Sequence, residues 1–169
     1  MFWAGAKKGN FDSKHAYSIA TGSFVYMSSF SGSWVWKLDN LPRIKTFIWQ
    51  CLHNSIRVGE CLVKRCLRDS ATCPSCQRES ESILHRLRDC EAARLTWWQM
   101  GIHESSNFYE GNLNSCLEKN CMYNGSRMSS QPPWSIVFPF SIWLMWKHRN
   151  DVVFKNHHVQ SSVHKDVLF

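Results

Sequence analysis

The motif Cys73-Pro74-Ser75-Cys76, continued by His85 and Cys90, carries more structural information than any other part of this chain. Its three thiols and one imidazole are the soft sulfur and nitrogen ligands that tetrahedral zinc prefers. Pro74 fixes one φ angle and Ser75 tolerates a bend, so the first two cysteines suit a tight turn. The motif therefore predicts a structural Zn²⁺ site with four ligands, which are Cys73, Cys76, His85 and Cys90.

The spacing of the last two ligands restricts the local backbone. Five residues of α-helix turn through about 500°, which would leave His85 and Cys90 roughly 140° apart on the helix surface. Helix must therefore end before Cys90, or never begin, if both side chains are to reach one metal ion. Ser82 is a candidate cap for a short helix that carries His85. The alternative interpretation is a set of small buried cysteines beside a core histidine.

The segment before this motif predicts a helix with one buried face. Pro42 suits the first position of a helix, where its missing N–H is not needed. Apolar residues then recur at helical spacing, and they are Ile44, Phe47, Ile48, Cys51 and Leu52. Shorter helices are expected over residues 13–20 and 60–68, the second of them with Cys61 and Cys66 as small core residues.

The segment after the motif predicts one more helix and then a loose connection. Residues 91–100 are expected to be helical, with Leu95, Trp97 and Trp98 turned inward. Residues 101–133 are rich in Gly, Asn and Ser and close with a Gln-Pro-Pro sequence. Such a composition is typical of a linker or a loosely held insert.

Residues 134–154 form a second strong helical pattern. Pro139 should kink this helix or mark its true start. The predicted inner face consists of Ile136, Val137, Phe140, Trp143 and Leu144.

Together these elements predict a mainly α-helical fold. It comprises a small helical domain around a Cys3His zinc site and a separate C-terminal helix after a loose linker. The expected boundaries are 1–100 for the zinc-binding domain with its zinc core at 73–90, 101–133 for the linker or insert, and 134–169 for the C-terminal helix and tail.

The composition restricts the partners and the compartment. A net charge of +7 over 169 residues favours an acidic partner such as nucleic acid. Eight cysteines without a secretory leader favour metal binding in a reducing compartment, so we expect an intracellular protein, nuclear or cytoplasmic. The same charge would also suit an anionic membrane surface. The longest apolar run, at 134–146, is much shorter than the about 20 residues of a membrane-spanning helix, so we expect a soluble protein without a membrane partner.

Several motifs occur in an order that resembles a known family. They are Phe11-Asp12-Ser13-Lys14-His15-Ala16-Tyr17, Trp34-Val35-Trp36-Lys37-Leu38, the helix pattern from Leu41 to Asn54, and the metal motif followed by Trp97-Trp98. Over residues 2–100 this order resembles the zinc-binding region of plant non-LTR (LINE-type) retrotransposon reverse transcriptases. Trp146-Lys147-His148-Arg149-Asn150 resembles a segment that precedes RNase H in the same retroelement proteins. Arg57-Val58-Gly59 departs from the Pro-Thr-Arg that is usual in the family, which leaves the local turn open.

The resemblance implies a module that binds zinc and assists in handling nucleic acid, RNA or DNA, without being a catalyst. A zinc ion with four protein ligands has no open position for water, which agrees with a structural role. The chain contains no Tyr-x-Asp-Asp pair of a polymerase and no cluster of carboxylates suited to two-metal chemistry. We therefore expect no catalytic residues and no enzymatic activity.

Basic residues around the metal motif are the candidates for phosphate contacts. Lys and Arg neutralise phosphates with little dependence on base sequence. The candidates are Lys64, Arg65, Arg68, Arg78, Arg86, Arg88 and Arg94. Trp97 or Trp98 could offer a stacking surface to a base. The alternative is a structural or protein-interaction domain, or an inactive retroelement remnant, that docks a protein partner through residues 134–155.

Overall fold

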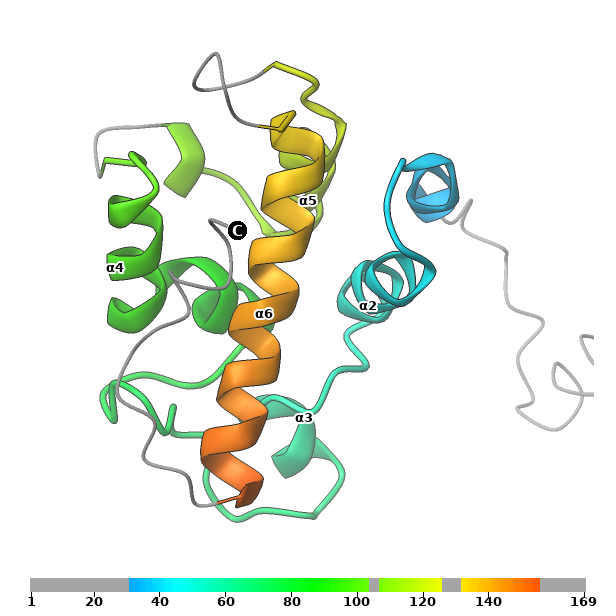
Figure 1. Ribbon diagram of the computed structural model, residues 1–169. Helices are drawn as coiled ribbons and strands as arrows, with labels where there is room; N and C mark the ends of the chain where they lie inside the picture. Colours follow the sequence, from blue (N-terminus) through cyan, green and yellow to red (C-terminus); the bar gives the residue numbers. More distant parts are fainter. Residues whose placement is uncertain (1–30, 104–106, 126–131, 156–169) are drawn as a thin grey trace, which may run out of the picture. The chain divides into compact units, whose positions relative to one another are not determined.

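The computed structural model describes residues 31–103, 107–125 and 132–155, and these residues form a mainly helical fold (Figure 1). Contacts divide the chain into two units, 1–33 and 34–169, and the α-helices of the described residues all belong to the second. The only β-type pairing among the described residues is an isolated bridge between Thr72 and Ser80. The mainly α class is confirmed. The helix predicted over 13–20 lies outside the described residues.

The elements follow one another as η1 (Ser31–Lys37), α2 (Pro42–Leu52), α3 (Gly59–Lys64), η2 (His85–Asp89), α4 (Glu91–Gln99), η3 (Asn107–Tyr109), α5 (Leu113–Met122) and α6 (Trp134–Lys155). η1 and η3 are 3₁₀ turns, whereas η2 is a π-helical turn.

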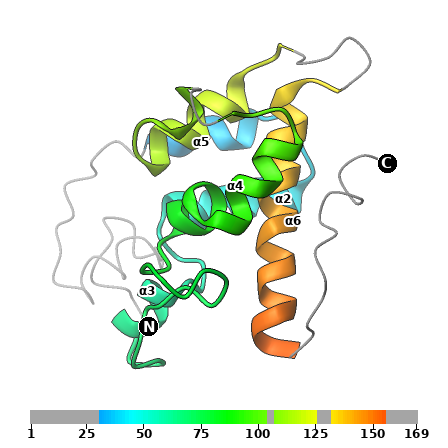
Figure 2. The same ribbon diagram turned by 90° about the vertical axis from the view of Figure 1, so that its left-hand side faces the viewer.

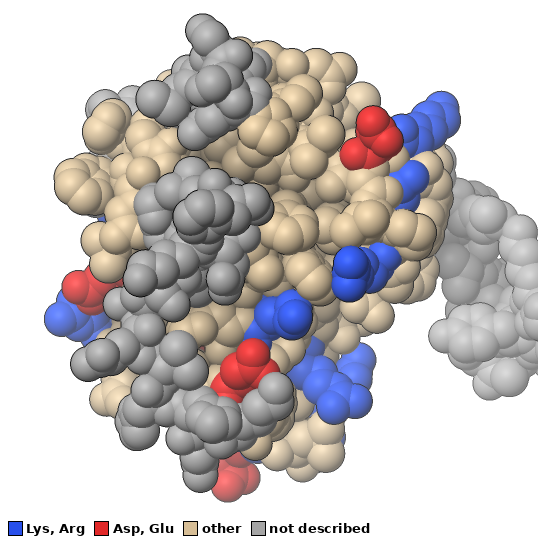
Figure 3. All heavy atoms as spheres, viewed as in Figure 1, with Lys and Arg blue, Asp and Glu red and all other residues tan. Residues whose placement is uncertain are grey.

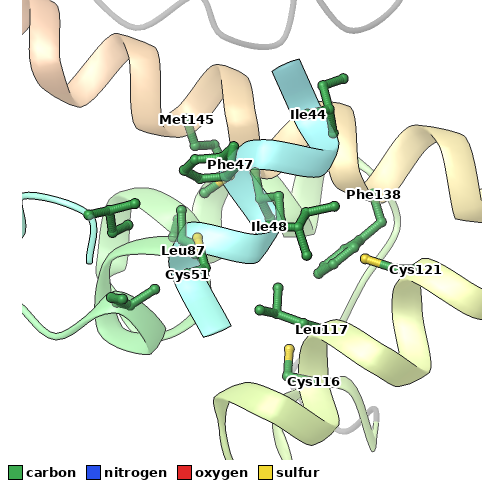
Figure 4. Packing of buried hydrophobic residues seen from close by; sticks show 14 of the residues in the cluster. Ile44, Phe47, Ile48, Cys51, Leu87, Cys116, Leu117, Cys121, Phe138 and Met145 are labelled. Atoms are coloured by element: carbon green, nitrogen blue, oxygen red, sulfur yellow. The ribbon is translucent and has the colours of Figure 1, made fainter. Parts of the chain in front are cut away.

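α2 supplies the centre of the core, as its sequence predicts. Pro42 occupies the first position of the helix. The ring of Phe47 stacks on that of Trp146 of α6, with 6.3 Å between their centroids. Figure 4 shows the inner face of α2 directed toward residues of α5 and α6. The buried residues of the predicted stripe are Ile44, Phe47, Ile48 and Cys51.

α6 is packed into the domain and is not the separate helix that the sequence suggested. It contacts α5, α2 and η2, and the two ribbon views show it crossing α2 (Figures 1 and 2). α6 has neighbours on several sides, so its contacts decide which of its side chains are buried. The apolar periodicity of its sequence alone did not identify this buried face. Ile136 of the predicted face is 37% exposed. The buried residues of α6 include Trp134, Phe138, Ile142, Met145 and Arg149.

Pro139 lies inside α6, which continues through it. A proline cannot donate a hydrogen bond to the carbonyl four residues earlier, which here belongs to Ser135. The side chain of Asn40 supplies a replacement, because its Nδ2 donates to Ser135 O at 3.0 Å. This hydrogen bond ties the connection between η1 and α2 to the first turn of α6.

Residues 107–125 form two helices where the composition suggested a linker. The side chain of Asn112 caps α5 by accepting a hydrogen bond from the Ser115 amide at 3.0 Å. Leu117 is buried, and Asn120 Oδ1 accepts a hydrogen bond from Trp134 Nε1 at 3.0 Å. The prediction of a loose segment was wrong for α5. A few buried residues on one face are enough to pack this helix against the domain, although most other residues of the segment are polar.

α3 and α4 bury side chains that differ from those predicted. α3 ends at Lys64, and Cys66 is exposed at a φ of +53°, so it is not a core residue. On α4, Trp97 is fully buried and its Nε1 donates to Leu87 O at 2.9 Å. Leu95 and Trp98 are instead exposed.

Candidate metal centre

A tight backbone turn brings the first two cysteines together. The Gln77 amide donates to Cys73 O at 2.9 Å, and the Cys73 amide donates to Glu79 O at 2.8 Å. Gln77 has a φ of +54°, in the left-handed region, which lets the chain reverse within a few residues. The bridge between Thr72 and Ser80 closes the base of this turn.

The π-helical turn η2 brings the last two ligands to the same side. Ser82 Oγ accepts a hydrogen bond from the His85 amide at 3.0 Å, as expected of the cap of a short helix that carries His85. The Cys90 amide then donates to His85 O at 2.7 Å, an i→i+5 hydrogen bond. Because this turn is wider than that of an α-helix, Cys90 lies on the same side of the turn as His85. In an α-helix the two residues would point in different directions. Helical geometry ends at Cys90, whose ψ is 141°.

The four predicted ligand atoms converge on one point. The Sγ atoms of Cys73, Cys76 and Cys90 and a ring nitrogen of His85 all lie within 4.8 Å of one another. The sulfurs of Cys73 and Cys90 are 3.8 Å apart, and Cys76 Sγ is 3.4 Å from His85 Nε2. Tetrahedral bonds of about 2.3 Å to sulfur and 2.0–2.1 Å to nitrogen place such ligands roughly 3.5–3.8 Å apart. The residues therefore fit a zinc ion, and the sulfurs are too far apart for disulfides.

The surroundings of the cluster shift the pKa values of two of its thiols in opposite directions. Burial raises the pKa of the Cys76 thiol, but hydrogen bonds from the Arg78 and Glu79 amides and from the His85 side chain outweigh it and lower the pKa to about 6. Burial raises the pKa of Cys90 to about 12. Glu79 Oε2 lies 3.0 Å from His85 Nδ1, so this carboxylate is placed to orient the ring with Nε2 toward a metal.

Arg86 is buried against the cluster and is not available to a nucleic acid. Its Nη1 donates to Ser75 Oγ at 2.8 Å, and its Nη2 donates to Met145 O of α6 at 3.4 Å. Burial lowers the pKa of its guanidinium, while the nearby thiols of Cys90 and Cys73 raise it. Its place in the sequence, one residue after a ligand, suggested a phosphate contact. The structure makes it an internal charge instead.

Arg88 is also buried, which overturns its assignment as a phosphate contact. Its Nε donates to Asp89 Oδ1 at 2.7 Å. Its Nη1 donates to the carbonyls of Glu110 and Gly111 at 3.0 and 3.1 Å. The guanidinium thus holds the η3–α5 connection against the metal region, and its donors are used within the protein.

The other predicted basic residues remain nearer the surface. Lys64 and Arg65 are exposed, and Arg68 is half-buried. Arg78 is 79% exposed, with its Nη1 3.7 Å from Glu91 Oε2. Arg94 is half-buried and its guanidinium lies 4.8 Å from the centroid of the Tyr109 ring.

A buried ion pair that was not predicted from the sequence joins residues 73–90, here called the metal loop, to α6. Both side chains of Glu81 and Arg149 are fully buried, and Arg149 Nε donates to Glu81 Oε1 at 2.8 Å. Glu81 Oε2 also accepts a hydrogen bond from the Gly59 amide at 2.8 Å. A Cβ on Gly59 would lie 2.6 Å from Ala71 O, so this close approach requires glycine. The resemblance singled out the segment that contains Arg149, but nothing in the sequence paired it with Glu81.

A cleft of about 590 Å³ lies beside the metal centre. Cys76 and His85 form part of its wall, and the 59% exposed ring of Trp98 forms another part. Its acidic lining residues are Glu79, Asp89 and Glu91. The cleft is therefore aromatic and of mixed charge.

The helices of the described residues include none that is both long enough and apolar enough to cross a membrane.

Comparisons with known proteins agree with this geometry. Residues 11–97 match a family described as zinc-binding in reverse transcriptase. A protein of Arabidopsis thaliana, named as a putative ribonuclease H protein, is 31% identical over 159 residues. The alignment covers 91% of this chain and 25% of that relative, so the chain spans about a quarter of its length. No solved structure gives a significant match. Because the family match covers more than half of the chain, this chain belongs to the family of zinc-binding domains of reverse transcriptase.

Proposed function

We propose that this chain is a non-catalytic, retroelement-derived module in which Cys73, Cys76, His85 and Cys90 hold a structural Zn²⁺ ion and whose basic surface binds nucleic acid. The convergence of these four ligand atoms within 4.8 Å carries the proposal. When bound, zinc would supply a fixed tetrahedral crosslink between the turn at residues 73–76 and the π-helical turn η2. Four protein ligands fill its coordination sphere, which favours a structural role over hydrolysis.

Metal binding would contribute much of the folding free energy. Structural zinc binds small peptides with about 10–16 kcal/mol at neutral pH, which equals or exceeds the whole stability of a typical domain. Cys73 and Cys90 belong to the same buried cluster as Leu87 and Trp97. Loss of the ion should therefore disturb the core as well as the loop.

Nucleic acid is the partner that the charge supports best. The chain carries 20 Lys and Arg against 13 Asp and Glu. Exposed Lys and Arg side chains contact phosphates with little dependence on base sequence. The protein-interaction alternative loses support, because the apolar face of α6 that would dock a partner is used inside the domain.

Two measurements test this function. Purified protein should contain one zinc ion per chain, and a Cys76→Ser variant should contain much less. The zinc-loaded protein should bind single-stranded RNA or DNA at low salt, with an affinity that falls steeply between about 50 and 200 mM salt. A metal-free native protein would contradict the zinc site, and an absence of binding at low salt would eliminate the nucleic-acid role.

A further inference from the structure

Two cations from different helices share one tryptophan at the junction of α2 and α6. The guanidinium carbon of Arg43, on α2, lies 5.3 Å from the centroid of the Trp143 ring of α6. Lys147 Nζ, one turn further along α6, lies 4.9 Å from the same centroid. Cation–π contacts of this kind restrict the side chains without neutralising their charge. Two positive charges are therefore held close together at the surface, since Arg43 and Lys147 are both exposed.

The opposite flank of α2 continues this surface toward η1. Lys45 Nζ donates to Trp36 O at 3.2 Å. The ring of Trp36 itself is 51% exposed. We name the group formed by Arg43, Lys45, Lys147, Trp36 and Trp143 the α2–α6 cationic surface.

The cations of this surface have no carboxylate partner within the described part of the chain. Ion pairs are formed there by Arg78 with Glu91, Arg88 with Asp89 and Arg149 with Glu81. None of them involves Arg43, Lys45 or Lys147. Figure 3 shows Lys and Arg side chains following one another over η1, α2 and the adjoining part of α6, with few acidic side chains between them.

The cleft beside the metal centre is less suited to a polyanion. Its lining includes the carboxylates of Glu79, Asp89 and Glu91, and Glu91 already pairs with Arg78. These negative carboxylates would repel a phosphate. The α2–α6 cationic surface instead offers cations without a carboxylate partner among the described residues and an exposed indole.

We propose that the α2–α6 cationic surface is where this domain binds single-stranded nucleic acid. Arg43, Lys45 and Lys147 contact the phosphodiester backbone, and Trp36 stacks on a base. A single strand is favoured because an exposed indole can stack only on a base that is free of its duplex neighbours. This inference rests on the proposed function and names the surface that would bind the nucleic acid. None of the residues of this surface is among the basic candidates around the metal motif.

The test compares two double variants of the zinc-loaded full chain. Arg43→Gln with Lys147→Gln alters the surface, and Arg65→Gln with Arg78→Gln is the control, with the same loss of charge at exposed positions elsewhere. Binding of a labelled single-stranded oligonucleotide is measured over a salt series, with RNA and DNA arms and a duplex arm. Zinc content and helicity are measured on every variant to verify folding.

The first double variant should lower the slope of log affinity against log salt by about 1.4, since each phosphate contact to a single strand contributes about 0.7. The control should keep nearly the full slope, and Trp36→Ala should weaken binding while leaving the slope unchanged.

Different failures have different meanings. Equal loss of slope in both double variants, or a larger loss in the control, would overturn this surface and leave the proposed function intact. Tighter binding to duplex than to single strands would overturn it as well. The assignment of this surface to nucleic acid would also be overturned if the Arg43→Gln, Lys147→Gln variant loses binding to phosphatidylserine vesicles but keeps its affinity for the oligonucleotides. If the unaltered chain binds no nucleic acid at low salt, the proposed function fails together with this inference.

Discussion

At the scale of single residues, Arg86 shows how charge is balanced around the metal centre. Three thiolates and one Zn²⁺ ion leave one net negative charge, and a buried charge is costly unless it is compensated. Arg86 is buried beside the cluster, and the thiols of Cys90 and Cys73 raise its pKa against the effect of burial. Sequence reasoning could not find this role, because an arginine one position after a ligand is more often at the surface.

Replacing Arg86 should weaken zinc binding. Arg86→Met keeps the buried length and removes the charge, and residues that support metal ligands typically contribute about 10–100-fold in affinity. We expect a loss within this range in competition with a chromophoric chelator. Arg78→Met is the control, because Arg78 is close in sequence to the same site but is exposed and paired with Glu91. Equal affinities for Arg86→Met and the unaltered protein would show that the guanidinium serves only packing.

The pair of Glu81 and Arg149 should be strongly coupled. Removing one partner of a buried ion pair costs about 3–5 kcal/mol, because the other charge is left uncompensated. Arg149→Met and Glu81→Gln should each lower the free energy of unfolding in urea by an amount of this order. The double variant should lose less than the sum of the two. Additive losses would mean that the two side chains stabilise the fold independently, despite the 2.8 Å hydrogen bond between them.

At the scale of elements, the sequence predicted helices better than the faces they bury. The buried face of α2 was predicted except for Leu52, which is half-buried, because the partners of α2 cover one continuous stripe of apolar residues. On α4, the buried positions are Ala93 and Trp97, and a nine-residue helix gives too few positions to distinguish this face from that of Trp98. α6 is apolar on several sides, so only the position of α2 and α5 decides which side is inside.

The π-helical turn is the other element that the sequence specified only in part. The spacing of His85 and Cys90 excluded a continuing α-helix, and the structure ends helical geometry at Cys90. The solution, an i→i+5 hydrogen bond that brings the two ligands together, could not be predicted from the residues, because such turns have no strong sequence signature of their own.

The hydrogen bond between Asn40 and Ser135 should depend on Pro139. Asn40→Ala is expected to lower the free energy of unfolding by about 1 kcal/mol, the usual net value of such a bond. In a Pro139→Ala background the new amide at residue 139 can donate to Ser135 O, so the same change should cost little. A thermodynamic cycle from urea unfolding of the four proteins measures the difference. Equal costs in both backgrounds would show that Asn40 acts through packing alone.

At the scale of the whole molecule, the metal loop and α6 form one structure although they are distant in sequence. Arg149 of α6 neutralises Glu81 of the metal loop, and Met145 O of α6 accepts a hydrogen bond from Arg86. Phe138 of α6 stacks on Trp97, with 5.5 Å between ring centroids. The family match ends at residue 97, whereas the core that supports the metal site continues to α6.

A chain truncated after residue 133 should therefore bind zinc poorly. Without α6, Glu81 would lose the Arg149 guanidinium, and Trp97 would lose its stacking partner Phe138. We expect zinc affinity to fall and cooperative thermal unfolding to be lost. Arg149→Met in the full chain separates the ion pair from the apolar contacts, since it removes only the first. If the truncated chain binds one zinc ion with undiminished affinity and unfolds cooperatively, the zinc domain ends near residue 100, and α6 is an attachment to it after all.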